Sequence, residues 1–330
     1  MKNIYLSIKG AVLCSAVAAM FLAAGCEKTE YKYVSGDTPL DVEYDNKVSS
    51  EKIRLISFNI QNGMWADQRN GYDNFVKWVA EYDPDICCFQ EASSIYTDDA
   101  SASASRNKRY LPYKYQNFVP STTLDEEPTG WIELAARWGH EYVVLGAHQD
   151  NFPVVFTSKF PIECVQKLNG TELSHGGVHV KIKGINLIGL HLWPQKYAKG
   201  EATTGTGGNA YRLSEIQTML SRTINNSEYY TEKRWLMMGD FNSGFTSAVT
   251  KEMNANSFSD ILVENHNYGG SRIDYIYATD EMLRYVVRSE IIRDGFAHSE
   301  QLPGYDGQTW WKYSDHYPLM VDFEIFAEEE

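Results

Sequence analysis

The chain has 330 residues, of which 30 are Lys or Arg and 44 are Asp or Glu, so its formal net charge at pH 7 is −14. Most non-specific affinity for nucleic acid comes from Lys and Arg at phosphates, so this balance argues against a general nucleic-acid-binding protein. It does not exclude a nuclease, because a bound divalent cation supplies local positive charge at one scissile phosphate.

The N-terminal segment has the pattern of an export signal. Two lysines precede an uncharged apolar run at 10–24, and Gly25 and Cys26 follow it. The run is shorter than the roughly 20 apolar residues that a transmembrane helix needs. The pattern predicts a secretory signal at 1–25, with Cys26 as the lipidated first residue of a bacterial lipoprotein. The alternative is an ordinary signal peptide in which Cys26 has no role.

A lipid anchor on Cys26 predicts a location in the cell envelope, at the outer membrane or cell surface. Residues 26–50 are polar and lack periodicity, which is typical of a tether between membrane and domain. Loss of the two lysines in the signal would change the net charge from −14 to −16. No second shift in composition follows, so residues 51–330 are predicted to form a single domain.

Nine apolar runs, rich in β-branched or aromatic residues and bounded by Gly, Pro, Asn or Asp, predict strands. They lie at 53–60, 85–91, 142–148, 153–159, 177–182, 185–192, 234–241, 272–279 and 317–326. Apolar residues at helical spacing predict helices at 72–82 and 212–224. Many strands with few, spaced helices indicate sheets covered by helices in a layered α/β or α+β domain.

Polar side chains recur at the ends of these runs. Asp240 and Asn242 in "MMGDFNS" are two residues apart, so in an extended strand they point to the same side. The alternative is a turn whose polar side chains bond their own backbone. Six such ends in one domain favour a shared rim. The polar residues at these ends are Asn59, Glu91, His191, Asp240, Asn242, Asp274, Asp315 and His316.

This set of residues is chemically coherent. Carboxylates with amide oxygens form a hard oxygen shell that suits Mg²⁺ or Mn²⁺. The cysteines show no C-x-x-C spacing, which argues against a structural zinc site and favours packing roles for Cys87, Cys88 and Cys164. Two histidines with nearby carboxylates supply acid/base and anion-binding groups. The set predicts metal-assisted hydrolysis of a phosphoester.

Seven pieces of the chain, taken in order, carry a family resemblance. They are "ISFNIQNG", "DICCFQEA", "TSKFPI", "GLHLWP", "MMGDFNS", "SRIDYIYA" and "SDHYPL", and they span about 53–326. Together they resemble the endonuclease/exonuclease/phosphatase superfamily of metal-dependent hydrolases, which includes deoxyribonucleases, sphingomyelinases and inositol polyphosphate phosphatases. The resemblance implies a four-layer α/β/β/α sandwich of two packed mixed sheets flanked by helices, with the site at one edge of the sheets.

By position, the resemblance implies a metal site for Mg²⁺, with Mn²⁺ as an alternative. Glu91 would be the principal ligand, and Asn59 and Asp315 would help directly or through water. Gln61 stands two residues after Asn59, where some nuclease members carry an acid, so a second metal contact at that position is not implied.

The resemblance also implies roles in the reaction. Asp240 would orient or deprotonate the attacking water or assist the leaving group, and Asn242 would position the phosphate. His316, held by Asp274, would act as base or stabilise the pentavalent phosphorane. His191 would bind a phosphate oxygen or protonate the leaving group. The sequence leaves open whether Asp240 or His316 takes the proton of the water.

Further residues are candidates for substrate binding. His175 lies in a loop before a strand and is predicted to face the site, whereas Arg272 is predicted either to contact phosphate or to form a salt bridge. Trp193 follows the strand that ends in His191. Tryptophans between the motifs form either an apolar or sugar-stacking wall or ordinary core packing. They are Trp65, Trp131, Trp138, Trp193, Trp310 and Trp311.

The sequence therefore predicts a secreted, lipid-anchored, Mg²⁺-dependent enzyme that hydrolyses a phosphodiester or phosphomonoester. Nucleic acid, a phospholipid headgroup, and a sugar or inositol phosphate remain open as substrates. One alternative is a nuclease acting on DNA or RNA, with nucleic acid as substrate only. Another is a non-catalytic ligand-binding module on the same fold. No protein partner is implied.

Overall fold

The computed structural model describes residues 50–68, 71–92, 129–147, 152–262, 272–296, 301–303, 309–311 and 313–326. The chain forms two units, residues 1–51 with 325–330 and residues 52–324. Nearly all of the described residues belong to the second unit. The predicted signal at 1–25, its Cys26, and the tether at 26–50 lie outside the described residues, except for the last residue of the tether.

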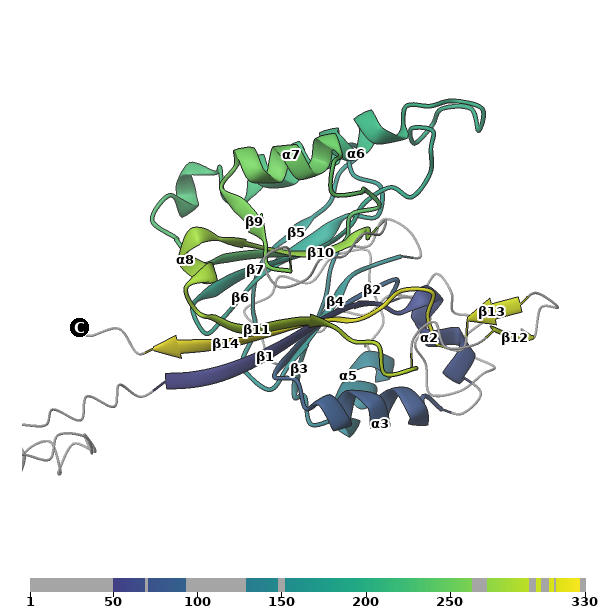
Figure 1. The fold of residues 1–330 in the computed structure, drawn as a ribbon, viewed down its shortest axis with the longest axis vertical. Coiled ribbons are helices and arrows are strands. Elements are labelled where there is room, and N and C mark those ends of the chain that lie inside the picture. The colour runs from purple at the N-terminus through teal and green to yellow at the C-terminus, as the bar shows by residue number, and fades with distance from the viewer. Residues whose placement is uncertain are drawn as a thin grey trace, which may run out of the picture. The chain divides into compact units, whose positions relative to one another are not determined.

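The second unit contains two six-stranded sheets (Figure 1). The first has the strand order β11-β14-β1-β2-β4-β3, and the second has the order β5-β6-β7-β8-β10-β9. The first comprises β1 (Ser50–Asn59), β2 (Ile86–Gln90), β3 (Tyr142–Leu145), β4 (Val155–Ser158), β11 (Val286–Ile291) and β14 (Leu319–Phe326). The second comprises β5 (Glu163–Leu168), β6 (Gly177–Ile182), β7 (Ile185–His191), β8 (Trp235–Asp240), β9 (Phe258–Asp260) and β10 (Asp274–Thr279). A separate hairpin pairs β12 (Gln301–Pro303) with β13 (Thr309–Trp311).

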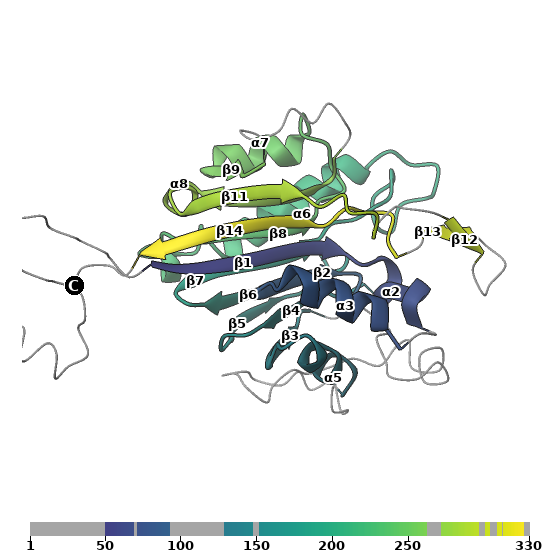
Figure 2. The same ribbon diagram turned by 60° about the horizontal axis from the view of Figure 1, so that its bottom comes forward.

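Helices cover the outer faces of the two sheets (Figure 2). The first sheet carries α3 (Asp73–Tyr82) and α5 (Thr129–Arg137), and the second carries α6 (Gly208–Arg222) and α7 (Ala248–Ala255). Shorter elements are α2 (Gln61–Gln68), the 3-10 turn η1 (Ser227–Tyr229) and α8 (Asp280–Leu283). In the described part of the chain, no helix has the length and apolar character needed to span a bilayer. The predicted sandwich of two mixed sheets flanked by helices is confirmed.

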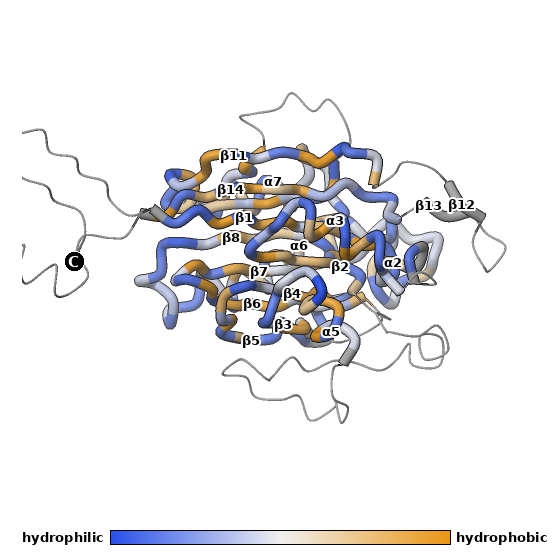
Figure 3. Tube along the Cα trace, turned by 90° about the horizontal axis from the view of Figure 1, so that it is seen from below, coloured by the Kyte–Doolittle hydropathy of each residue, from blue (hydrophilic) through white to orange (hydrophobic). Residues whose placement is uncertain are grey.

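Successive side chains of a strand point to opposite faces of its sheet, so a central strand places side chains on both the outer and the inner face. Ile56 and Phe58 on β1 pack against α3 and α5 in one core cluster, so Asn59 points to the opposite, inner face. Trp131 and Trp138 lie in this cluster. Of the two roles predicted for the tryptophans, these two therefore have the core-packing one. Figure 3 shows hydrophobic residues along the central strands and hydrophilic ones in many of the connecting turns.

The inner faces of the two sheets are in direct contact. A Cβ atom on Gly189 of β7 would lie 2.9 Å from Sγ of Cys88 on β2 and 2.8 Å from the ring of Phe156 on β4. A glycine at this position therefore lets the sheets approach closely. Cys87, Cys88 and Cys164 are all buried free thiols, as their predicted packing role requires.

Each sheet has a parallel strand pair at its centre. β1 runs parallel to β2 with Asn59 opposite Gln90, and β7 runs parallel to β8 with His191 opposite Asp240. Parallel neighbours end at the same edge of a sheet, which is where open α/β sheets commonly place ligands. The fold therefore brings the ends of four central strands into the region where the polar residues were predicted to gather.

Candidate active site

Three of the predicted residues are neighbours across adjacent strands of the second sheet. Asp240 is the last residue of β8, and its register partners are His191, the last residue of β7, and Asp274, the first residue of β10. Because β10 runs antiparallel to β8, its beginning lies at the same edge as the end of β8. The register alone therefore places a histidine and two carboxylates side by side.

The carboxylate of Asp240 is the centre of the site. Its Oδ1 accepts the backbone N–H of Asn242 at 2.8 Å. Its Oδ2 accepts Asn59 Nδ2 at 3.1 Å and lies 3.6 Å from His191 Nε2 and 3.7 Å from His316 Nε2. Burial, followed by the negative charge of the neighbouring Asp274, raises the pKa of Asp240 to about 7 against the opposing effect of His316.

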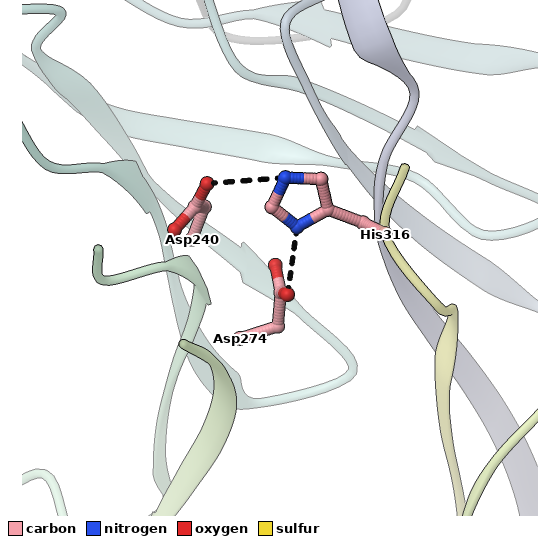
Figure 4. A group of neighbouring side chains, drawn as sticks. All are labelled: Asp240, Asp274 and His316. Atoms are coloured by element: carbon pink, nitrogen blue, oxygen red, sulfur yellow. Dashed lines mark hydrogen bonds and ion pairs between the residues drawn. The ribbon is translucent and has the colours of Figure 1, made fainter. Parts of the chain in front are cut away.

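His316 is held by Asp274 (Figure 4). Its Nδ1 lies 2.8 Å from Asp274 Oδ2, and its Nε2 points toward Asp240. Burial alone would lower the pKa of His316, but the charge and hydrogen bond of Asp274 outweigh burial and hold that pKa well above its usual value. The Ser314 hydroxyl donates to the Asn59 carbonyl at 2.6 Å and accepts the His316 N–H at 3.0 Å. This contact ties the segment before β14 to the end of β1.

Asn59 links carboxylates from the two sheets. Its Nδ2 donates to Glu91 Oε1 at 3.2 Å as well as to Asp240, and its Oδ1 accepts the Gln61 N–H at 3.0 Å. Glu91 Oε2 accepts the Asn62 N–H at 2.7 Å. Gln61, Asn62 and Glu91 have φ values of 44°, 55° and 56°, a left-handed backbone region that non-glycine residues seldom adopt. Such backbone conformations tend to cluster at functional sites.

The donor set fits a divalent cation. Ligand atoms of Asp240, Asp274 and His316 lie within 4.8 Å of one another, and Asn59 joins Glu91 to this group. Burial also raises the pKa of Glu91, because removal from water disfavours the charged form of a carboxylate. Glu91 therefore adds a further buried carboxylate to the group. Hard carboxylate oxygens of this kind suit Mg²⁺ or Mn²⁺. The side chain of Asp315 is more exposed, at 41%, with Oδ1 3.7 Å from His316 Nε2.

His191 belongs to a stack of rings. Its ring centre lies 4.4 Å from that of His175, and the ring centre of Trp193 lies 6.0 Å from that of His175. Burial and the positive charges of the neighbouring histidines lower the pKa of His191 well below its usual value, so its ring is neutral at pH 7. His175 is only 4% exposed. Its predicted place beside the site agrees with this stack, whereas its contact with substrate stays a prediction.

Two other predicted residues have their polar groups engaged. Asn242 donates through Nδ2 to the Leu192 carbonyl at 2.9 Å, which places its side chain beside β7. Arg272 forms an ion pair with Asp260 and stacks on Tyr275 with its guanidinium carbon 4.5 Å from the ring centre. Of the two alternatives predicted for Arg272, the structure shows the salt bridge. The side chains of Trp65, Trp310 and Trp311 lie outside the described residues.

A family model described as the endonuclease/exonuclease/phosphatase family matches residues 56–316. This chain belongs to that family. Members of the family are metal-dependent phosphoester hydrolases, so the chain is an enzyme of this class. The matched range contains every residue assigned above to the acidic cluster and the ring stack. No curated protein matches the chain in sequence.

Solved structures with the same fold are distant in sequence from this endonuclease/exonuclease/phosphatase family member. An AP endonuclease from Archaeoglobus fulgidus is 17% identical with a TM-score of 0.51, and covers 84% of this chain and 100% of its own. A family protein from Bacteroides thetaiotaomicron is 12% identical with a TM-score of 0.50, covering 84% and 100%. A 3'-5' exonuclease from Neisseria meningitidis is 12% identical with a TM-score of 0.50, covering 82% and 99%. These likenesses show the shared fold.

Two buried charged residues of this family member were missed by the sequence reasoning. Arg212 and Glu215 lie on α6 and are 7% and 0% exposed. The sequence did contain a signal for the burial of Glu215, because this residue adjoins the apolar helix face formed by Ile216 and Leu220. Charged residues of an amphipathic helix usually lie on its solvated face, so the sequence analysis assigned neither residue a role. Both side chains instead contact the backbone next to the ring stack.

Proposed function

We infer that this family member is an exported, lipid-anchored, Mg²⁺-dependent phosphoesterase that acts on a small or surface-presented phosphodiester or phosphomonoester. The observation that carries this inference is the convergence of Asn59, His191 and His316 on one oxygen of Asp240, at 3.1 to 3.7 Å. A carboxylate surrounded in this way is suited to hold a water molecule beside a bound phosphate.

The direction of each proton transfer follows from the protonation state of the side chain involved. Asp240, with its pKa raised to about 7, takes a proton from the attacking water as the new O–P bond forms. His316, kept protonated by Asp274, donates to a phosphoryl oxygen and stabilises the negative charge that develops there. The P–O bond to the leaving group breaks on the opposite side of phosphorus. The leaving oxygen takes a proton from water, and the proton that Asp240 then releases neutralises the hydroxide. The neutral His191 binds a phosphoryl oxygen.

The acidic residues would hold the metal ion. Glu91, with Asp240 and Asp274 close by, offers carboxylate oxygens, and Asp315 offers another on the exposed side of His316. A bound Mg²⁺ supplies Lewis-acid polarisation of the phosphoryl group. Without such an ion, the buried carboxylates would repel an anionic substrate.

Charge supports a small substrate over a long polyanion. The chain has a net charge of −14, and Arg212 and Arg272, the arginines described near the site, are both committed to internal contacts. Two structures with this fold are named as nucleases, so DNA and RNA are the second candidate substrates. A non-catalytic binding module is disfavoured, because the acidic and histidine positions of the site are all filled.

Anchoring through Cys26 rests on the apolar run at 10–24 and on the small residues before the cysteine. The anchor would hold the domain at the outer membrane or cell surface through the polar tether at 26–50. Lipid substrates are compatible with this location, although the anchor does not require them.

A substrate panel tests the proposed activity. Purified protein is assayed with Mg²⁺ against bis-p-nitrophenyl phosphate, p-nitrophenyl phosphate, sphingomyelin, inositol phosphates, DNA and RNA. We expect turnover that EDTA abolishes and that Mg²⁺ or Mn²⁺ restores. Asp240→Asn and His316→Ala should each lower turnover by at least about 10²-fold, the usual scale for an acid/base group. Turnover that persists in EDTA would refute the metal-dependent reaction.

A further inference from the structure

Helix α6 makes a buried charged contact with the two loops that carry the ring stack. Glu215 Oε1 accepts the Ser174 N–H at 2.7 Å and the Ser174 hydroxyl at 2.5 Å, and its Oε2 accepts the Trp193 N–H at 3.0 Å. Arg212, nearly one turn earlier, donates to the carbonyls of Trp193 at 2.7 Å and Gln195 at 3.0 Å. The peptide groups on both sides of Trp193 are therefore held by oppositely charged side chains of one helix.

These anchors lie immediately beside the stacked rings. Ser174 precedes His175, and the His175 ring stacks on His191 and on Trp193 with interplanar angles of 27° and 29°. Among the described residues, no hydrogen-bond partner reaches His191 Nδ1. A histidine that acts at a site is commonly oriented by a hydrogen bond to its second nitrogen. The rings that contact His191 are those of His175 and Phe152.

We propose that Glu215, assisted by Arg212, is a positioning residue that orients His191 through Ser174 and the His175 ring. This inference rests on the proposed function, because it assigns a role to His191 in the phosphoester reaction. The chain of contacts runs from the Glu215 carboxylate to the Ser174 backbone, from there to the His175 ring, and from that ring to His191 beside Asp240. Arg212 fixes the Trp193 side of the same stack.

A buried carboxylate is well suited to this position. All three groups that reach Glu215 are donors, and a carboxylate offers only acceptors. The Glu215→Gln substitution keeps the shape of the side chain but replaces one acceptor with an NH₂ group. That NH₂ group would then face the N–H of either Ser174 or Trp193. At least one loop therefore loses its anchor without creation of a cavity.

Hydrogen exchange tests the anchor without reference to activity. Mass spectrometry of Glu215→Gln should show at least about 10-fold faster exchange at the Ser174 and Trp193 amides, because their shared acceptor is altered. Amides in the middle of β8 should keep the wild-type rate. Unchanged exchange at both loops would overturn the proposed anchor.

Kinetics test the link from the anchor to His191. Glu215→Gln should lower kcat on bis-p-nitrophenyl phosphate by about 10-fold or more, the usual scale for a residue that orients a functional side chain. KM should change by less than about threefold, because transition-state alignment rather than ground-state binding is lost. His175→Ala should show the same defect, and the double variant should be no worse than the stronger single variant. Additive losses, or a loss in KM alone, would contradict the proposed route.

Glu232→Gln is the matched control. Glu232 is also a glutamate that accepts two hydrogen bonds on the second sheet, from Lys181 at 2.6 Å and Asn186 at 3.2 Å, but it lies just before β8 begins, whereas Asp240 ends that strand. We expect lower stability in this variant and unchanged kcat.

Faster loop exchange with wild-type kcat in Glu215→Gln would refute the positioning role. A wild-type protein without turnover would instead refute the proposed function, and the exchange result would still decide whether Glu215 holds the loops.

Discussion

Gly239 controls how closely β7 and β8 approach at the site, and replacing it with alanine should damage both stability and activity. Gly239 precedes Asp240, pairs with Leu190 on β7, and has a φ of 137°. A Cβ atom there would lie 2.0 Å from the Leu190 carbonyl oxygen. That oxygen belongs to the backbone, so relief of the clash requires the two central strands to separate.

The expected cost has two parts. Holding a non-glycine residue in this backbone region costs about 1–3 kcal/mol, and overpacking against rigid neighbours costs about 1–3 kcal/mol more. A total of about 2–6 kcal/mol would lower Tm by about 4–24 °C in a domain of this size. Displacement of the Asp240 carboxylate by about 1 Å would lower kcat about 10²-fold.

Thermal unfolding followed by circular dichroism, together with turnover measured well below Tm, checks this prediction. Gly244→Ala is the control, because it lies four residues beyond Asp240 and a Cβ atom there meets nothing within 4 Å. We expect the control to keep the wild-type Tm and turnover. A Gly239→Ala variant with Tm within about 1 °C of wild type would show that the strands are not packed at this position as described.

Three further predictions concern pH and location. Asp274→Asn should lower the pKa of His316, because the charge of Asp274 keeps that pKa high. The alkaline limb of the pH profile of kcat/KM should therefore move to lower pH. An unmoved limb would contradict the role of Asp274. Burial lowers the pKa of both His140 and His179 to about 4. Both histidines should therefore make their full contribution to the free energy of unfolding above about pH 6.5. As the pH falls toward 4, that free energy should decrease by up to about 1.4 kcal/mol per pH unit for each histidine. Urea titrations across this range check the fall, and a flat profile would exclude it. Cys26→Ala should abolish incorporation of labelled fatty acid and release the protein from membranes, whereas an unchanged membrane fraction would argue against the anchor.

The strands that the sequence did not predict share one physical property. All nine apolar runs became strands, and the bounds of β6 agree completely with the prediction. The strands that were missed all lie at the edge of a sheet: β5, β9 and β11 in the six-stranded sheets, and β12 and β13 in the two-stranded hairpin. The edge strand β3 was predicted, because its last three residues are apolar and buried. An edge strand has one neighbour and more exposed side chains, so it lacks the continuous apolar run that marks a central strand. The observed α6 begins four residues earlier than predicted, because its first turn lacks apolar periodicity.

Local sequence patterns could find the polar residues at strand ends but not their partners, and the pairing of His316 with Asp274 came only from the family resemblance. The pairing of Asp240 with both His191 and Asp274 depends on which strands are neighbours, and strand order is not written in local patterns. The role of Glu215 was hidden for the same reason, because its contacts are to backbone N–H groups 22 and 41 residues away. Backbone donors carry no residue-specific signal in a sequence.

The position of the site follows from the parallel pair at the centre of each sheet. Each central strand ends at the active edge, and the four ends supply Asn59, Glu91, His191 and Asp240. The Asn59 amide then joins Glu91 of the first sheet to Asp240 of the second. Because this one side chain bridges the sheets, the distance between the two carboxylates depends on how the inner faces pack. Sheet packing therefore contributes directly to the geometry that a divalent cation would require, although the packing contacts themselves lie away from the reacting groups.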